Sequence, residues 1–388
     1  MSNLDFDVII CGGGPGGSTT ALGFADTDIK VAVIEKSSFP REKVCGDGMA
    51  PYIPKALDKI SPKFKKAFDQ FKERTPITHV NFYSFQGESV ILPFPEPWFV
   101  SSRYHFDNFL YQQASALPNV SYFLEEQVTH VSISDTGVRI ETNRNQIFSG
   151  KILIGCDGAT SMVRRQLTNY KIDPAYHCAA VRAYFEGVTD ININTFEFHY
   201  VSEYPNGYFW VFPSENNLAN VGFSLITEDI TKNNINIRET LFEVIERNPT
   251  LQKRFKNAKP IGEIKGWSIP LGYGQHPISG NRFMLVGDAA SVADPLSGEG
   301  IGQAIVTGRI AAFHAKECFL SNDFTAKKMS NYDKAVDEKW GTTIRKRRYW
   351  AEIIAKHKWT LNLAVKLLGS NNFISTITKK AIIKLLAT

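Results

Sequence analysis

The stretch Ile10-Cys11-Gly12-Gly13-Gly14-Pro15-Gly16-Gly17 decides the fold, because it sets the pattern Gly-x-Gly-x-x-Gly directly behind the apolar run Val8-Ile9-Ile10. A second apolar run, Val31-Ala32-Val33-Ile34, ends at Glu35, 18 residues beyond the last of these glycines. Strand, helix, strand and acid in this register predict a βαβ unit that holds the ADP half of a dinucleotide. A glycine-rich turn without a ligand is the alternative, and the register argues against it.

Each glycine of the pattern has its own physical task. Gly12 permits the tight turn out of the strand, Gly14 lets the backbone approach a pyrophosphate, and Gly17 allows the helix to pack closely on the sheet. The helix N-terminus then faces the phosphates with its partial positive charge. The carboxylate of Glu35 would accept hydrogen bonds from the ribose hydroxyls.

Later stretches bear on which dinucleotide is bound. Residues 152–158 form a strand that ends in an Asp-Gly turn, and residues 282–290 form another that ends in Gly287-Asp288. The run Asp-Pro-Leu-Ser-Gly-Glu-Gly-Ile-Gly at 294–302 then leads into a helix. In this order the motifs resemble the flavoprotein superfamily of p-hydroxybenzoate hydroxylase. The resemblance implies that the fingerprint holds FAD and that Asp288 binds the ribityl chain. It also implies that the helix opening near Gly300 faces the flavin pyrimidine ring and stabilises the anionic reduced form.

Two further strings narrow the family. They read Pro-Arg-Glu-Lys-Val-Cys-Gly-Asp-Gly-Met at 40–49 and Tyr-Phe-Trp-Val-Phe-Pro at 208–213. Together they resemble the geranylgeranyl reductase family, flavoenzymes that saturate isoprenoid double bonds. In that family the first string lies by the isoalloxazine ring and the second lines the substrate tunnel, which implies substrate contacts for Tyr208, Trp210 and Phe212. The aromatic string alone also fits a plain core strand, since its residues alternate between two faces.

The fingerprint and the resemblance together imply one set of cofactor contacts. The set is Gly12, Gly14, Pro15, Gly17, Glu35, Lys36, Arg41, Cys45, Gly46, Asp47, Arg103, Asp157, Gly158, Gly287, Asp288, Gly298, Gly300 and Ile301. Cys45 is also the candidate catalytic residue, because it could donate or relay a proton. The alternative is that this cysteine only fits tightly against the flavin.

The resemblance predicts a reaction in which hydride leaves N5 of the reduced flavin and a proton reaches the other alkene carbon. The alternative is a monooxygenase, an aromatic hydroxylase or halogenase that activates oxygen, although the halogenase string Trp-x-Trp-x-Ile-Pro is absent. A flavin-binding sensor or lipid carrier is the non-enzymatic alternative. The chain has one dinucleotide fingerprint and no second, so we expect the reductant to be transient NAD(P)H or a protein such as reduced ferredoxin.

The pattern of elements predicts an α/β chain, α+β overall, with two lobes interleaved in sequence. Residues 1–75, 101–175 and 276–330 are expected to form a discontinuous, Rossmann-like FAD-binding lobe. Residues 76–100 and 176–275 read as strands of an antiparallel substrate-binding sheet that roofs the flavin. The prolines at 93, 95 and 97 are expected to break the strand before them. Residues 331–388 read as basic amphipathic helices.

Charge is concentrated at the C-terminal end. Residues 339–388 hold eleven Lys or Arg against Glu352 alone, so this segment is +10 while the whole chain is +5. Apolar residues from Trp350 to Leu385 recur there at helical spacing. A basic amphipathic helix pair predicts peripheral contact with anionic lipid, and deletion of 340–388 is expected to abolish that contact while FAD stays bound. A helical cap on the body of the protein is the alternative, and no nucleic-acid motif accompanies the basic residues.

The remaining composition is that of a globular protein, with 43% hydrophobic and 21% charged residues. No run reaches the length of a membrane-spanning helix, and the first apolar stretch reads as a strand and not as a signal peptide. Five scattered cysteines indicate reduced thiols, and neither they nor the eight histidines show a metal-ligand spacing. We therefore expect no metal and a cytoplasmic protein with peripheral contact at the inner membrane surface. Its partners would be a prenyl lipid, with or without an electron-donor protein.

Overall fold

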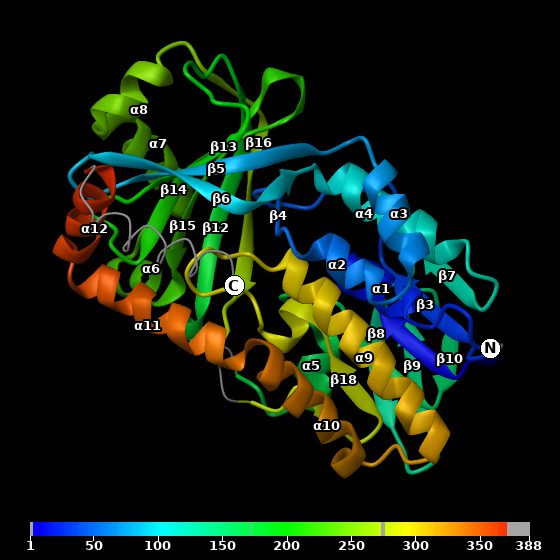
Figure 1. Ribbon diagram of the computed structural model, residues 1–388. Coiled ribbons are helices and arrows are strands. Elements are labelled where there is room, and N and C mark those ends of the chain that lie inside the picture. Colours follow the sequence, from blue (N-terminus) through cyan, green and yellow to red (C-terminus); the bar gives the residue numbers. More distant parts are fainter. Residues whose placement is uncertain (1–2, 172, 273–275, 371–388) are drawn as a thin grey trace.

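The computed structural model describes residues 3–171, 173–272 and 276–370. Two lobes lie side by side, each built on its own large sheet, and the last helices run along one side of both (Figure 1). The predicted mixed α/β architecture with interleaved lobes is confirmed. Chain segments pass back and forth between the lobes, so residues distant in sequence meet where the lobes touch.

The first lobe is built on a six-stranded sheet whose strands are parallel except at one edge. Its order is β17 (Ser279–Gly280), β18 (Phe283–Leu285), β11 (Ile152–Gly155), β2 (Val8–Cys11), β3 (Val31–Glu35) and β7 (Val120–Leu124), with β17 antiparallel. β2, β3, β11 and β18 are buried throughout, as expected for a parallel sheet covered on both faces. The central strand β2 therefore ends, at Cys11, in the middle of the lobe.

Helices enclose this sheet. They are α1 (Pro15–Leu22), α2 (Ile53–Asp58), α3 (Pro62–Gln70), α4 (Arg103–Ser115), α5 (Met162–Leu167), α9 (Ile301–Ser321) and α10 (Ala326–Val336). Two short 3-10 turns, η1 (Pro174–Tyr176) and η3 (Gly287–Ala290), lie in the connections. A smaller sheet, ordered β1 (Asn3–Asp5), β10 (Ile147–Gly150), β9 (Val138–Thr142) and β8 (Val128–Ile133), adds to the lobe. Residues Asp135-Thr136-Gly137 join β8 and β9, which pair antiparallel as a hairpin.

The second lobe is an eight-stranded sheet. Its order is β16 (Lys259–Pro270), β12 (His177–Glu186), β15 (Ala219–Ile226), β14 (Gly207–Pro213), β13 (Thr195–His199), β5 (Thr75–Tyr83), β6 (Ser89–Val100) and β4 (Gly48–Met49). The pairs are antiparallel except β13–β5, which is parallel. Helices α6 (Thr227–Asn233), α7 (Ile237–Arg247) and α8 (Pro249–Arg254) follow β15, with the 3-10 turn η2 (Glu215–Asn217) before it. Because β4 comes from the first 75 residues, the loop before it is tied to the second lobe.

The aromatic string forms β14, and its two faces have different surroundings. Phe209 and Val211 are buried in a core with residues of α7 and α8. The alternate residues Tyr208, Trp210 and Phe212 face the other side, where they line a cavity. Both interpretations of the string therefore describe one strand, whose one face is core and whose other face is cavity wall.

The proline cluster does not break the strand, and this expectation was wrong. β6 continues through Pro93, Pro95 and Pro97 to Val100. The register of β6 against β5 shifts between Trp98 and Pro93, so the proline segment lies at an irregularity of the ladder. On its other edge β6 is paired only by β4, at Phe99 and Val100, and prolines are tolerated at such irregularities and edges.

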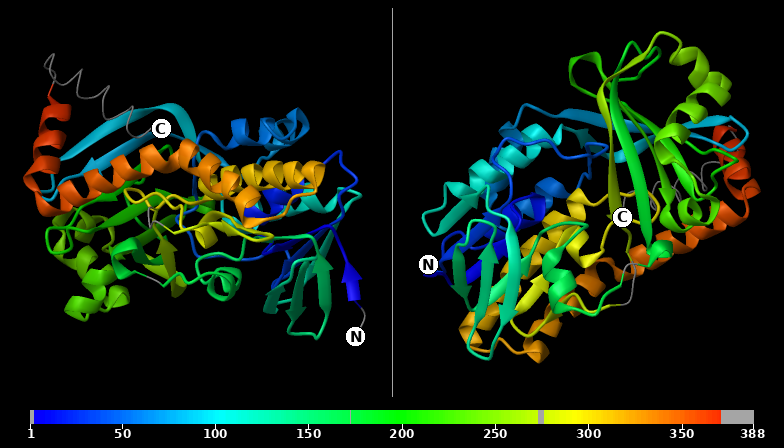
Figure 2. Two further views of the ribbon diagram at one scale, coloured as in Figure 1. Left: turned by 90° about the horizontal axis from the view of Figure 1, so that it is seen from below. Right: turned by 180° about the vertical axis from the view of Figure 1, so that it is seen from behind.

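The C-terminal helices are part of the fold. A π-helical turn, η4 (Asp337–Gly341), leads into α11 (Thr342–Lys356) and then α12 (Trp359–Gly369). Trp340 and Ile344 are buried in the main core, and Val365 and Leu368 of α12 pack in a cluster with residues of β6. Both views of Figure 2 show α12 against the β5–β6 end of the large sheet. Val365 and Leu368 of the predicted stripe thus pack on the body of the protein, whereas Trp350 is 43% exposed.

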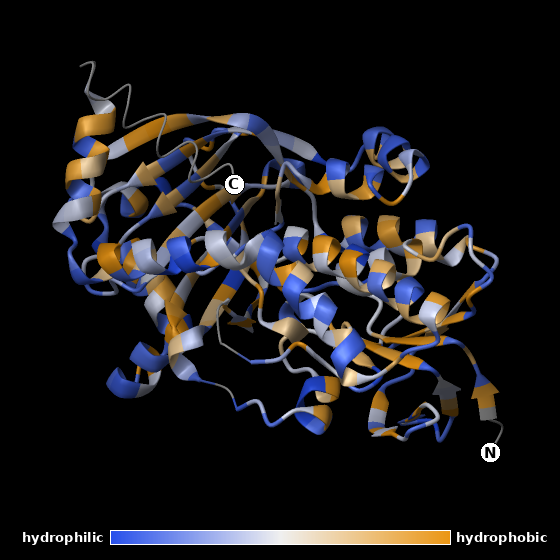
Figure 3. Cartoon of the chain, turned by 60° about the horizontal axis from the view of Figure 1, so that its bottom comes forward, coloured by the Kyte–Doolittle hydropathy of each residue, from blue (hydrophilic) through white to orange (hydrophobic). Residues whose placement is uncertain are grey.

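The outer surface of this segment differs between its two helices. Figure 3 shows much of α11 as hydrophilic and most of α12 as hydrophobic. The predicted apolar positions Ile374, Ile377, Ala381 and Leu385 and the basic Lys379, Lys380 and Lys384 lie outside the described residues. None of the helices in residues 3–171, 173–272 and 276–370 is both long and apolar enough to cross a membrane.

Candidate active site

A single cavity of about 980 Å³ lies between the lobes and is closed on one side by α11 and α12. The glycine loop after β2 and the start of α9 line one end of it. Apolar side chains of β5, β6, β13, β14 and α12 line the other end. A polar end for a dinucleotide and an apolar end for a second molecule are therefore continuous.

The glycine loop has the geometry that its sequence predicted. Gly12 has φ +96°, and a Cβ on Gly17 would lie 1.8 Å from the carbonyl oxygen of Gly12. Gly17 therefore stands behind the loop and does not line the cavity, whereas Gly12, Gly14 and Pro15 do. Near Gly14 the only described atom within 4 Å of an added Cβ is Arg41 Nη2, at 3.4 Å. The space in front of Gly14 is thus open for a ligand.

Glu35 is 5% exposed, and its carboxylate organises the loop as well as lining the cavity. Oε2 accepts a hydrogen bond from the backbone N–H of Gly13 at 2.7 Å, and Oε1 accepts one from Ser37 N at 3.1 Å. The neighbouring Lys36 also lines the cavity but is exposed. The acid thus links the tip of β3 to the glycine loop, and its predicted contact with the ribose hydroxyls stays a prediction.

Two arginines stand at the same end and share one acid. Arg103 donates two hydrogen bonds to the carboxylate of Asp107, at 2.6 and 2.7 Å, and Arg41 Nη1 lies 3.1 Å from the same group. Asp107, which is fully buried, raises the pKa of Arg103 against the effect of burial. Both arginines line the cavity, where their guanidinium groups can meet an anionic ligand.

The remaining predicted contacts of the first lobe lie at the ends of β11 and β18. Asp157 and Gly158 follow β11, and Gly287 and Asp288 follow β18; all four line the cavity. Asp157 also caps α5, because its carboxylate accepts hydrogen bonds from Met162 N and Ser161 Oγ. The carboxyl ends of adjacent parallel strands thus converge on one edge, which is where open α/β sheets bind ligands.

The loop that leads into α9 is held from three sides. Asp294 forms a buried ion pair with Arg347 of α11, and its other oxygen accepts hydrogen bonds from Leu296 N and Ser297 N. The Tyr208 hydroxyl of β14 donates to Ser297 O at 2.5 Å. Gly298, Gly300 and Ile301 line the cavity on this loop. Both the large sheet and the C-terminal helices therefore position the start of α9.

The Cys45 loop is anchored to the large sheet. The carbonyl oxygen of Cys45 accepts hydrogen bonds from Arg182 Nε at 3.1 Å and Asn220 Nδ2 at 2.9 Å. Trp210 Nε1 donates to the amide oxygen of Asn220 at 3.0 Å. Cys45 and Gly46 line the cavity. The loop therefore keeps a fixed place in front of the aromatic wall.

Asp47 lies behind this loop and does not line the cavity, unlike the predicted contacts Cys45 and Gly46. It is fully buried and accepts hydrogen bonds from Tyr184 Oη at 2.5 Å and Asn220 Nδ2 at 2.8 Å. Burial raises its pKa to about 6, although Arg182 and both hydrogen bonds oppose that rise. The pattern Cys-Gly-Asp-Gly could not show that its acid points away from the cavity.

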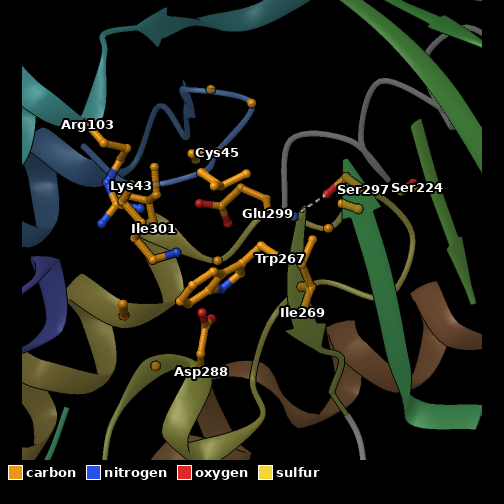
Figure 4. Close-up of a pocket in the computed structure, with 18 of the residues that line it drawn as sticks. Lys43, Cys45, Arg103, Ser224, Trp267, Ile269, Asp288, Ser297, Glu299 and Ile301 are labelled. Carbon is orange, nitrogen blue, oxygen red and sulfur yellow. Dashed lines mark hydrogen bonds between the residues drawn. The ribbon is translucent and has the colours of Figure 1, made fainter. Parts of the chain in front are cut away.

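Several lining residues were missed by sequence reasoning. Lys43 and Trp267 face the cavity near Cys45 and Asp288 (Figure 4), with Lys43 Nζ 4.6 Å from the centre of the Trp267 ring. Burial, and then Arg103, lowers the pKa of Lys43. Glu299 also lines the cavity. Arg182 carried the one available signal, a charge inside an otherwise apolar strand.

The apolar end is formed by aromatic and aliphatic side chains. Trp210, Phe212, Phe196 and Phe198 line it from the sheet, and Leu361, Ala364, Val365 and Leu368 line it from α12. Phe212 lies 4.3 Å from Phe196 and 5.2 Å from Phe198 between ring centroids. Such a wall suits a hydrocarbon chain and offers it few polar partners.

The polar end fits FAD. Gly14 leaves a space that a Cβ would fill, Arg41 and Arg103 supply positive charge, and α1 and α9 both start at the cavity. Arg41 Nε is buried and makes no hydrogen bond among the described residues, although it lies 3.7 Å from Glu35 Oε1, so it keeps a donor that a ligand could use. When bound there, FAD would supply hydride transfer.

Comparison with known proteins identifies the family. Residues 5–308 match the model of the FAD binding domain. A digeranylgeranylglycerophospholipid reductase from Methanocella arvoryzae is 30% identical, over 97% of this chain and 94% of its own. The crystal structure of a geranylgeranyl bacteriochlorophyll reductase-like protein from Thermoplasma acidophilum is 27% identical, with a TM-score of 0.83 over 100% of this chain and 96% of that one. A flavin-dependent brominase, 21% identical with a TM-score of 0.76 over 98% of both chains, shares the fold.

The cavity thus combines a dinucleotide cradle with an apolar wall, and these matches run through nearly the whole chain. The resemblance seen in the sequence motifs is confirmed. The protein is an FAD-dependent oxidoreductase of the FAD-binding domain family, and within it the chain belongs to the geranylgeranyl reductases.

Proposed function

We propose that the protein reduces C=C double bonds of a geranylgeranyl-type isoprenoid lipid, using hydride from reduced FAD. The observation that carries this proposal is the single cavity, which joins the glycine loop to an apolar end lined by Tyr208, Trp210 and Phe212. An isolated alkene has no carbonyl that a donor could polarise, so its reduction depends on holding the bond in place away from water. The apolar end offers such a place.

The related protein from Methanocella arvoryzae supports the substrate class, since its name describes a reductase of a digeranylgeranyl glycerophospholipid. The electron donor is, in this proposal, one that docks transiently, NAD(P)H or a reduced ferredoxin. Chemical reduction of the bound flavin replaces either donor, so the reaction can be tested before the donor is known.

An anaerobic assay tests the reaction. Chemically reduced holoenzyme is mixed with prenyl lipids under argon, and the products are measured by mass spectrometry. We expect a mass increase of about two hydrogens per reduced bond and reoxidation of the flavin without oxygen. A strict need for oxygen, with hydroxylated or halogenated product, would support the monooxygenase alternative. A reduced flavin that no lipid reoxidises would contradict the proposal.

We further propose that the protein reaches its lipid at an anionic membrane surface through α11 and α12. These helices line the apolar end of the cavity with one face and expose Trp359 (63%) and Leu363 (45%) on another. Lys346, Lys356 and Lys366 are exposed on the same two helices. Each such cation contributes on the order of 1 kcal/mol near an anionic surface, and salt screens that contribution.

Surface substitutions test this contact without removing core residues. We expect Trp359→Ser with Leu363→Ser, or Lys356→Glu with Lys366→Glu, to weaken sedimentation with anionic vesicles at low salt. The matched control is Phe313→Ser with Leu320→Ser, two exposed apolar residues of α9, which should leave binding unchanged. Equal loss in all variants, or no binding by the unaltered protein, would contradict a docking face on α11 and α12.

A further inference from the structure

Reduction of an alkene needs a proton as well as a hydride, so the cavity must hold an acid. Groups that line it and could donate a proton include Cys45, Lys43, Tyr200, Tyr208 and Glu299, and burial raises the pKa of Tyr200 to about 12. The Tyr208 hydroxyl already donates to Ser297 O, and burial raises the pKa of this tyrosine. It is therefore a weak acid with its proton engaged. The remaining candidates for the proton donor are Glu299 and two residues of the Cys45 loop, Cys45 and Lys43.

Glu299 lies immediately before the start of α9, and its side chain points from the loop into the cavity (Figure 4). Its Oε1 accepts a hydrogen bond from Gly302 N at 2.6 Å. Its Oε2 accepts one from the hydroxyl of Tyr52, the residue before α2, at 2.9 Å. The carboxyl group is thus held in one orientation by the helix on one side and by a tyrosine on the other.

The surroundings of Glu299, burial above all, favour its protonated form. Burial raises the pKa of this carboxyl to about 7, and nearby Asp294 adds to the rise. The hydrogen bonds from Gly302 and Tyr52 and the charge of Arg347 lower it by less. Because Arg347 is already ion-paired with Asp294, it does not fully neutralise a second carboxylate. A pKa near neutrality is the value that suits a general acid.

The position of Glu299 also matches the charge change of the reaction. The N-terminus of α9 offers partial positive charge to a reduced, anionic cofactor, and an ionised Glu299 at the same place would oppose it. A neutral Glu299 does not. When hydride leaves, the negative charge of the cofactor is lost, and the carboxyl group can then ionise without adding net charge to the cavity.

We propose that Glu299 is the acid that delivers the proton to the alkene. Hydride from reduced FAD forms a C–H bond at one carbon, the π bond breaks, and its electron pair takes the proton from the Glu299 carboxyl at the other carbon. The flavin is oxidised by two electrons and the alkene is reduced; solvent reprotonates the carboxylate after the product leaves. This assignment rests on the proposed function, and it gives Cys45 and Lys43 no part in proton delivery.

Glu299→Gln is the informative variant, because it keeps the size of the side chain, an oxygen that can accept from Gly302 N, and an NH2 group that can donate to the Tyr52 hydroxyl. In anaerobic single turnovers with reduced holoenzyme and prenyl lipid, we expect flavin reoxidation to slow by at least about a hundredfold. FAD affinity should stay within about twofold of the unaltered protein. The unaltered protein should lose rate as pH rises through about 7, and Glu299→Gln should lack that dependence. Glu299→Asp should restore part of the rate.

Cys45→Ser and Lys43→Gln are the matched controls, and both should keep the pH dependence of the unaltered protein whatever their rates. The proposal is overturned if Glu299→Gln keeps the rate, if its rate falls only in parallel with FAD affinity, or if the pH dependence disappears in Cys45→Ser or Lys43→Gln. The second of these outcomes would make Glu299 a capping residue of α9.

A second measurement does not need a substrate. Infrared difference spectra of the holoenzyme should show two buried carboxyl groups that titrate near neutral pH, Asp47 at about 6 and Glu299 at about 7, and Glu299→Gln should lack the second while keeping the first. If the unaltered protein reduces no prenyl lipid, the proposed function fails while this titration still reports on Glu299. If lipid is reduced but the second carboxyl group does not titrate, the assignment of Glu299 fails alone.

Discussion

Gly14 and Gly17 belong to one motif, yet the structure predicts opposite consequences for replacing each with alanine. Gly17 packs α1 against the turn after β2, and an added Cβ would lie 1.8 Å from Gly12 O and 2.9 Å from Gly12 C. Gly14 faces the cavity, and an added Cβ would meet only Arg41 Nη2, at 3.4 Å, among the described atoms. The first change should damage the fold, and the second should damage cofactor binding.

The magnitudes follow from these distances. In Gly17→Ala the clash is with backbone, so α1 must move away from β2. Overpacking of this kind typically costs about 1–3 kcal/mol of unfolding free energy, and a backbone clash belongs at or above the upper end. In Gly14→Ala the residue has φ −67°, which alanine adopts freely, so stability should change by less than about 1 kcal/mol. Its methyl group enters the space open to the pyrophosphate, so we expect at least a tenfold rise in the Kd for FAD, about 1.4 kcal/mol.

Two assays separate these effects. Denaturant unfolding of the apoprotein gives the stability, and quenching of flavin fluorescence gives the Kd for FAD. Gly266→Ala in β16 is the control, since an added Cβ there would make only ordinary contacts at 3.7 Å. The reasoning would be refuted if Gly14→Ala bound FAD as tightly as the unaltered protein, or if Gly17→Ala were as stable as it.

Three further predictions concern the loop before α9 and the C-terminal helices. Arg347→Met should lower the unfolding free energy by about 3–5 kcal/mol, because it leaves the buried Asp294 without its cation. The double variant with Asp294→Asn should recover part of this loss, and denaturant unfolding measures both. Because the pKa of Glu299 is raised in the folded state, its proton stabilises the fold at low pH, and this stability is lost as pH rises from about 4.5 to 7. At pH 8 the apo form of Glu299→Gln should therefore be more stable to unfolding than the unaltered protein, by at most about 3 kcal/mol. Deletion of 340–388 should lower the midpoint of thermal unfolding sharply and weaken FAD binding, because it removes the core residue Trp340 and the ion pair of Arg347. A truncated protein with an unchanged thermal midpoint and unchanged FAD affinity would show that these helices are dispensable.

The last of these predictions replaces the expectation, based on charge and periodicity alone, that deletion of 340–388 would leave FAD bound. An apolar stripe on a helix indicates that this face is buried, but the sequence does not identify the surface that buries it. Trp340 and Ile344 are covered by the main core, whereas Leu361 and Val365 line the cavity. Deletion of 340–388 would therefore change stability and the cavity wall together, which is why the membrane contact is better tested on exposed residues.

The parts of the site that sequence predicted are those that local geometry determines. Gly12, Gly14, Gly17 and Glu35 lie within one βαβ unit, and their spacing follows from the lengths of two strands and a helix. Alternation along residues 208–213 likewise predicted which side chains share a face. In both cases the signal is a period or a spacing within a short segment, so no knowledge of distant contacts was needed.

The rest of the site depends on contacts between distant segments, for which the sequence carries no period. The carbonyl oxygen of Cys45 is held by Arg182 and Asn220, which are 137 and 175 residues further along the chain. Asp294 is neutralised by Arg347 from a helix that its own motif does not include. These partners fix the positions of the Cys45 loop and of the loop before α9. A motif can therefore place Glu299 at the start of a helix, but only the packing of the Asp294–Arg347 pair and Tyr52 around it makes Glu299 a candidate proton donor.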